Sequence, residues 1–115
     1  MQISDLQRLL HMRAHCEAIT EYLERNNYSR DAFSSDRMFF DAVSMCVLQI
    51  GELANSLSEQ YRIETENEIP WKMIRGMRNA LAHTYGEIDE DMLWDTVIND
   101  IPKLAAFLVK ETGTE

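Results

Sequence analysis

Residues 39–57, FFDAVSMCVLQIGELANSL, contain the clearest helical period in the chain. The apolar side chains recur at spacings of 4, 3, 4, 3 and 4 residues, at Phe39, Val43, Cys46, Ile50, Leu53 and Leu57. This spacing places them on one face of an α-helix that can be buried in full, and we predict a helix over residues 35–61. Gly51 falls inside it, where glycine costs about 1 kcal/mol relative to alanine. The close approach of a neighbouring helix would explain why a glycine is tolerated there.

A second helix is predicted on the N-terminal side of this one, over residues 4–25. Ser4 and Gln7 fit a capping box, in which each side chain satisfies a backbone N–H of the first turn. Asn26 to Ser29 are expected to form the exit from this helix. The polar and acidic residues 64–68 are expected to form a loop.

Two helices are predicted on the C-terminal side. The third is short, over residues 70–83, with Pro70 in its first turn and Gly86 as a left-handed stop. The fourth is capped by Asp89, and Pro102 is expected to kink it. No strand is predicted, so the expected fold is all-α, an antiparallel four-helix bundle with a short third helix.

The chain has 115 residues, which suits one compact domain, expected over residues 1–111 with a frayed end at 112–115. No apolar run approaches the roughly 18 residues that cross a bilayer, and the N-terminus shows no signal-peptide pattern. We therefore expect a cytoplasmic protein. Cys16 and Cys46 are the only cysteines and fall on apolar helical stripes. They are expected to be free, buried thiols.

The charge of the chain is strongly negative but unevenly distributed. The formal net charge is −9 and the pI is about 4.7, which argues against nucleic-acid binding over the whole surface. Residues 69–86, however, contain no acid, and Lys72, Arg75 and Arg78 give this segment +3. The remaining residues therefore carry −12, which with +3 gives the total of −9. A local site for a polyanion is expected in this segment.

Residues 78–86, RNALAHTYG, bring together the side chains best suited to cleaving a phosphodiester. Arginine binds phosphate, and histidine moves protons near neutral pH. Arg78 and His83 are separated by about 140° around an ideal helix, so they do not share a face. Acting together therefore requires the helix to end near His83, a long reach by Arg78, or a second copy of the chain across a twofold axis.

Each residue of the motif has a possible chemical role. Arg78 would hold the phosphate and stabilise the transition state, and His83 at the helix C-terminus would donate a proton. Asn79 could orient His83 or a phosphate oxygen, and Tyr85 could position the backbone or stack on a base. In RNA the ribose 2′-OH supplies the nucleophile, so no metal is required. The same spacing also fits a structural reading, with Arg78 in a salt bridge and His83 as a helix cap.

Three other polar residues lie outside the motif. His11 and His15 have an i, i+4 spacing able to hold zinc but lack a third ligand, so no metal and no cofactor is expected. Glu52, beside Gly51, is expected to be a structural partner that orients Arg75 or Arg78.

The motif resembles a known family. Residues 78–85 match the R-x4-H-x-Y signature of HepT-like toxins, small helical ribonucleases of the HEPN superfamily. Residues 70–77, PWKMIRGM, resemble the family's lead-in to this motif, and residues 50–54, IGELA, resemble its second-helix segment. The resemblance covers nearly the whole chain.

The resemblance implies a HEPN four-helix bundle that forms a homodimer, with two copies of Arg78 and His83 lining a cleft at the interface. It implies a metal-independent endoribonuclease that is the toxin of a type II-like toxin–antitoxin system. It further implies that the RNA substrate binds at the cleft, where Lys72, Arg75 and Arg78 of the two chains lie close together. The antitoxin would be a minimal nucleotidyltransferase, called MntA in this family, which AMPylates Tyr85 and so silences the toxin.

Two other functions fit the same residues. A non-catalytic HEPN module would use Arg78 and His83 to bind a nucleotide or a nucleotidyltransferase partner without cleaving RNA. A purely structural protein would use the motif only to build a dimer.

Overall fold

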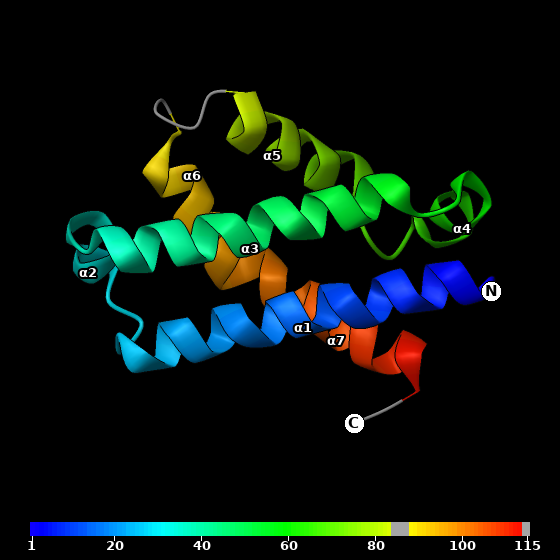
Figure 1. Cartoon of the computed structure of the whole chain (residues 1–115), viewed down its shortest axis with the longest axis horizontal. Coiled ribbons are helices and arrows are strands. Elements are labelled where there is room, and N and C mark those ends of the chain that lie inside the picture. The colour runs from blue at the N-terminus through cyan, green and yellow to red at the C-terminus, as the bar shows by residue number, and fades with distance from the viewer. Residues whose placement is uncertain (84–87, 114–115) are drawn as a thin grey trace.

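The computed structural model describes residues 1–83 and 88–113, with the side chain of His83 outside the description. In this part of the chain the secondary structure is entirely helical (Figure 1). The elements are α1 (Ile3–Arg25), α2 (Arg30–Ser35), α3 (Arg37–Ser56), α4 (Glu59–Thr65), α5 (Trp71–His83), α6 (Glu90–Asp95), the π-helical turn η2 (Thr96–Asp100) and α7 (Ile101–Thr112).

The arrangement confirms the predicted all-α bundle. In Figure 1, α1 and α3 lie side by side and run antiparallel, and α5 runs back along the other side of α3. The continuous segment α6–η2–α7 forms the fourth member and passes behind α1 and α3. The short helices α2 and α4 lie at opposite ends of α3. The bundle therefore has α3 at its centre, with its apolar face buried as the sequence period predicts.

The predicted helix over residues 35–61 is wrong at both ends. Asp36 separates the unpredicted α2 from α3, and its Oδ1 accepts hydrogen bonds from Met38 N at 3.0 Å and Phe39 N at 3.4 Å. At the other end Leu57 is extended (φ −61°, ψ 150°), and the Ser58 side chain accepts from Tyr61 N to begin α4. Two local caps thus end a helix that the apolar period alone would continue.

The predicted capping box of the first helix is also wrong. Helix α1 begins at Ile3, Gln2 is its N-cap without a side-chain hydrogen bond, and Ser4 lies inside the helix. One residue further on, Asp5 is buried, and its carboxylate accepts from Ser58 N at 2.9 Å and Ser58 Oγ at 2.6 Å. This contact ties α1 to the first turn of α4.

Several predicted boundaries are confirmed. The exit after α1 contains Asn27 and Tyr28 in the left-handed region (φ 55° and 54°). Asp89 caps α6 by accepting from the backbone N–H groups of residues 91 and 92. The π-helical turn η2 precedes Pro102, which lies in the first turn of α7, and the kink expected at Pro102 stays a prediction. The loop expected at residues 64–68 starts later, because α4 continues to Thr65.

The core is a single cluster that includes side chains from α1 to α7. Cys16 and Cys46 are buried in it as free thiols, as predicted. Among the described residues, no helix is both long enough and apolar enough to span a membrane. The predicted stop at Gly86 lies outside the described residues.

Candidate active site at the contact between α3 and α5

Helix α5 carries the first part of the motif and is anchored by two buried apolar side chains. Trp71 begins it, donates from its indole N–H to Thr65 Oγ1 at 2.8 Å, and packs edge-on against Phe107 with the ring centroids 6.1 Å apart. Leu81 is buried near the opposite end. Between these two buried residues, α5 packs along α3 (Figure 1).

Helix α5 crosses α3 where Arg78 contacts Gly51. A Cβ placed on Gly51 would overlap the Arg78 Cβ and would lie 3.1 Å from the Arg78 Cα. The neighbouring helix expected at this glycine is therefore present, and the residue that approaches is the arginine of the motif. Only glycine allows the two backbones to come this close.

The Arg78 guanidinium is held by two neighbours. Its Nε–H donates to Glu52 in an ion pair, and its Nη1–H donates to Asn79 Oδ1 at 2.9 Å. The Arg78 side chain is 26% exposed and that of Glu52 is 42% exposed. Of the two arginines considered for Glu52, the structure selects Arg78. These contacts use two of the five guanidinium N–H donors and fix the plane of the group.

The other two cations of the segment lie further toward the start of α5. Arg75 is exposed, and its Nε–H donates to Asn55 Oδ1 at 2.9 Å. Lys72 is exposed and lines, together with Arg75 and Arg62, a polar hollow of about 570 Å³. The three predicted cations thus occupy successive turns of one helix. Sequence reasoning missed Asn55, although it follows Glu52 at i+3 and so lies on the same side of α3.

The remaining motif residues are only partly placed. The structure describes α5 as far as His83, and the His83 side chain and the whole of Tyr85 lie outside the described residues. The helical backbone separates positions 78 and 83 by about 140°. The meeting of Arg78 and His83 in one cleft therefore stays a prediction.

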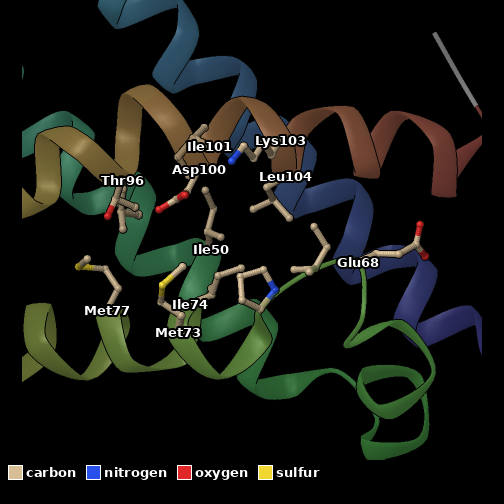
Figure 2. Close-up of a pocket in the computed structure, with 13 residues that line it drawn as sticks. Ile50, Glu68, Met73, Ile74, Met77, Thr96, Asp100, Ile101, Lys103 and Leu104 are labelled. Carbon is tan, nitrogen blue, oxygen red and sulfur yellow. The ribbon is translucent and has the colours of Figure 1, made fainter.

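A separate apolar cavity of about 290 Å³ lies between α5 and the η2–α7 segment (Figure 2). From α5 it is lined by Met73, Ile74 and Met77, which lie on the opposite flank of the helix from Arg75. Thr96 and Asp100 provide polar groups on its other wall. None of the motif residues that the structure describes lines this cavity, so it is distinct from the site around Arg78.

The structure does not bring a third metal ligand to His11 and His15 of α1 within the residues that it describes. Within residues 1–83 and 88–113, no group of three or more His, Cys, Asp or Glu side chains is arranged to hold a metal ion. Partial burial and the neighbouring His11 lower the pKa of His15 from its ordinary value.

The fold and this geometry define a class of protein, a small helical bundle in which an arginine of α5 is held against α3, five residues before a histidine. A family model described as "Ribonuclease HepT-like" matches residues 12–111. The chain therefore belongs to the HepT-like ribonuclease family, as the motif indicated. RNA is accordingly its class of substrate.

Individual relatives agree with this assignment. The chain is 31% identical over 96 residues to "Putative RNase TTE0752" of Caldanaerobacter subterraneus subsp. tengcongensis, covering 84% of this chain and 83% of the relative. It is 35% identical over 72 residues to "Probable ribonuclease HepT" of Thermococcus cleftensis, covering 63% of this chain and 64% of the relative. The comparison with solved structures gave no match.

Proposed function

We propose that this chain is a metal-independent endoribonuclease and the toxin of a type II-like toxin–antitoxin system. The observation that supports it most directly is the clamped position of Arg78. Its stem lies against Gly51, and its guanidinium is oriented by Glu52 and Asn79. A cation held in advance can stabilise developing charge without reorganising during the reaction.

The proposed reaction uses only groups of the protein and of the RNA. The ribose 2′-oxygen attacks the adjacent phosphorus, the P–O5′ bond breaks, and a 2′,3′-cyclic phosphate forms. Arg78 stabilises the extra negative charge on the phosphoryl oxygens, and His83 donates a proton to the leaving 5′-oxygen. The proton of the 2′-OH passes to a base, a role open to the second histidine of a dimer.

A homodimer completes this site in the proposal. Because positions 78 and 83 lie on different sides of α5, a twofold axis near its end would let Arg78 of one protomer work beside His83 of the other. The exposed cations Lys72 and Arg75 would extend the positive surface on which RNA lies.

The proposed partner is a minimal nucleotidyltransferase antitoxin that acts on Tyr85 in the cytoplasm. It would join the Tyr85 hydroxyl oxygen to the phosphorus of AMP, with pyrophosphate leaving from ATP. An added phosphodiester two residues after His83 would repel the RNA backbone and fill the cleft.

The test is expression of the chain together with its Arg78→Ala and His83→Ala variants. The parent should arrest growth and cleave RNA in buffer containing EDTA. Loss of a charge-stabilising group costs roughly 10²–10³ in rate, so both variants should relieve the arrest. If both remain as toxic as the parent, the site assignment is wrong. Cleavage that EDTA abolishes and Mg²⁺ restores would contradict metal independence.

Nucleotide binding and dimer formation, measured on the same proteins, separate catalysis from the two other functions. A non-catalytic module would bind nucleotides tightly in a calorimeter while leaving RNA intact at high protein concentration. A purely structural motif would ignore both ligands, and Arg78→Ala would dissociate the dimer.

A further inference from the structure

The cavity between α5 and the η2–α7 segment has the composition of a small-molecule site (Figure 2). Most of its lining consists of aliphatic side chains and methionines, with polar groups at a few points. Sites for small organic ligands are typically apolar clefts in which a few polar groups fix the orientation of the ligand. One wall of the cavity is the π-helical turn η2, and such turns occur frequently at functional sites.

The polar end of the cavity is formed by two side chains of η2. Thr96 and Asp100 are four residues apart, and both line the cavity. Among the described residues, neither side chain has a hydrogen bond or an ion pair. Figure 2 shows the half-buried Asp100 carboxylate directed toward α5, into the space between the two walls. Because an ionised carboxylate only accepts hydrogen bonds, this end of the cavity suits a positively charged N–H donor.

The two other charged residues of the lining do not replace such a donor. Lys103 follows Asp100 by one turn and makes no ion pair with it, and its exposed ammonium group remains hydrated at the end of a flexible stem. Glu68 forms an ion pair with Lys110, and Figure 2 shows its carboxylate directed away from the cavity. Asp100 is therefore the charged group that faces the cavity.

The apolar part of the cavity suits an aromatic ring. Met73 and Met77 of α5 and Ile50 of α3 contribute to its walls. A methionine thioether makes favourable contacts with aromatic rings and adapts its shape to them. A cavity of about 150 Å³ can bind benzene, so a volume of about 290 Å³ accommodates a two-ring group with a short chain. Met73 is 52% exposed, so a ligand can enter past its side chain.

The cavity adjoins the contact between Gly51 and Arg78. Ile50 directly precedes Gly51 in α3, and Met77 directly precedes Arg78 in α5. Both Ile50 and Met77 line the cavity. A ligand in the cavity therefore contacts α3 and α5 beside the point where the two helices cross.

We propose that this cavity binds an arylalkylamine, a flat aromatic group joined by a short chain to an ammonium group. The ring packs against Met73, Met77 and Ile50. The ammonium group donates hydrogen bonds to the Asp100 carboxylate and to the Thr96 hydroxyl. Binding at this site does not require ribonuclease activity, so the two proposals can fail independently.

The test uses three indole compounds that share one ring system and differ in the head group. Tryptamine carries an ammonium group, tryptophol a hydroxyl and indole-3-acetate a carboxylate. In methyl NMR spectra of the full chain labelled at its methionines, tryptamine should shift the signals of Met73 and Met77. The signals of the exposed methionines outside the cavity, Met38, Met45 and Met92, should stay in place.

The head group should decide the affinity for the parent. Tryptophol should bind on the order of tenfold more weakly than tryptamine, because it loses a hydrogen bond between charged groups. Indole-3-acetate should bind most weakly, because its carboxylate would face Asp100. Equal binding of the three compounds overturns the amine class. Unchanged Met73 and Met77 signals, or equal shifts at all methionines, overturn the site.

A pair of variants tests the role of Asp100. Asp100→Asn should remove the advantage of tryptamine over tryptophol. Asp95→Asn is the matched control, because Asp95 is exposed outside the cavity, accepts from Asn99 Nδ2 at 2.7 Å and carries the same charge. It should leave both affinities unchanged, and an equal effect of the two variants overturns the assignment. The series of head groups needs no variant, so it decides the proposal even where Asp100→Asn does not fold.

Discussion

Gly51 and Arg78 meet where α3 and α5 cross, so closely that any side chain on Gly51 would occupy the space of the Arg78 stem. Glycine lowers the stability of its own helix, but here it permits the contact that holds the arginine of the motif. The next residue, Glu52, binds the guanidinium of the same arginine. Two adjacent positions of α3 therefore set both the distance and the orientation of Arg78.

The first prediction is that Gly51→Ala destabilises the protein, although alanine is the better helix former. The added methyl group would overlap the Arg78 Cβ, and relieving the overlap should cost about 1–3 kcal/mol. Gly76→Ala is the matched control, because a Cβ there meets nothing within 4 Å, and it should stabilise by about 0.5–1 kcal/mol. Urea unfolding of both variants measures the difference. Stabilisation by both would show that the close approach does not exist.

The second prediction concerns Glu52 as a positioning residue. Glu52→Gln should lower kcat for RNA cleavage by on the order of tenfold, because the guanidinium loses its charged partner. The pair is partly exposed, so the free energy of unfolding should change by less than about 1 kcal/mol. Glu68→Gln, which breaks the exposed Lys110–Glu68 pair, should leave kcat unchanged. Equal effects of the two variants on kcat would rule out positioning by Glu52.

The third prediction compares two acidic residues that both accept backbone N–H groups. Asp5 is 1% exposed and accepts from Ser58 N and Ser58 Oγ, so Asp5→Ala should cost about 2–3 kcal/mol. Asp89 is an exposed N-cap, and Asp89→Ala should cost about 1 kcal/mol. Thermal unfolding of the two variants gives the comparison. The reverse order would show that the contact between α1 and α4 is weak.

The fourth prediction is a loss of stability at alkaline pH. Burial, and then the neighbouring Cys46, raise the pKa of the Cys16 thiol from 9.0 to about 12. In the unfolded chain this thiol ionises first, so its contribution is complete below pH 9 and is lost as pH rises toward 12. The urea concentration at the unfolding midpoint should therefore decrease as the pH is raised from 9 to 10.5. Cys16→Ala should reduce this slope, and an unchanged slope would contradict the shift.

Several features of the fold could be predicted because they depend on neighbours in sequence. Helix α5 was expected within one residue of its observed start, since Pro70 marks that boundary, and Asp89 was recognised as a cap. The short helix α2 was missed because six residues are too few to show a period. The break at Leu57 was missed because its apolar side chain continues the stripe while its backbone is extended.

The candidate site was predictable in part. Glu52 was expected beside an arginine because it follows the glycine at which a helix was expected to cross. Which arginine it binds, and the pairing of Arg75 with Asn55, depended on the register of α5 along α3.

The sequence by itself determined the apolar face of α3, the start of α5 next to Pro70, the acid-free segment around Arg78 and the family. These features are local, since helical period, caps and charge need only nearby residues. The tertiary structure alone decided that Gly51 faces Arg78 and that Glu52 orients it. That register joins residues 26 positions apart and is set by how two apolar faces pack together, which no local pattern encodes.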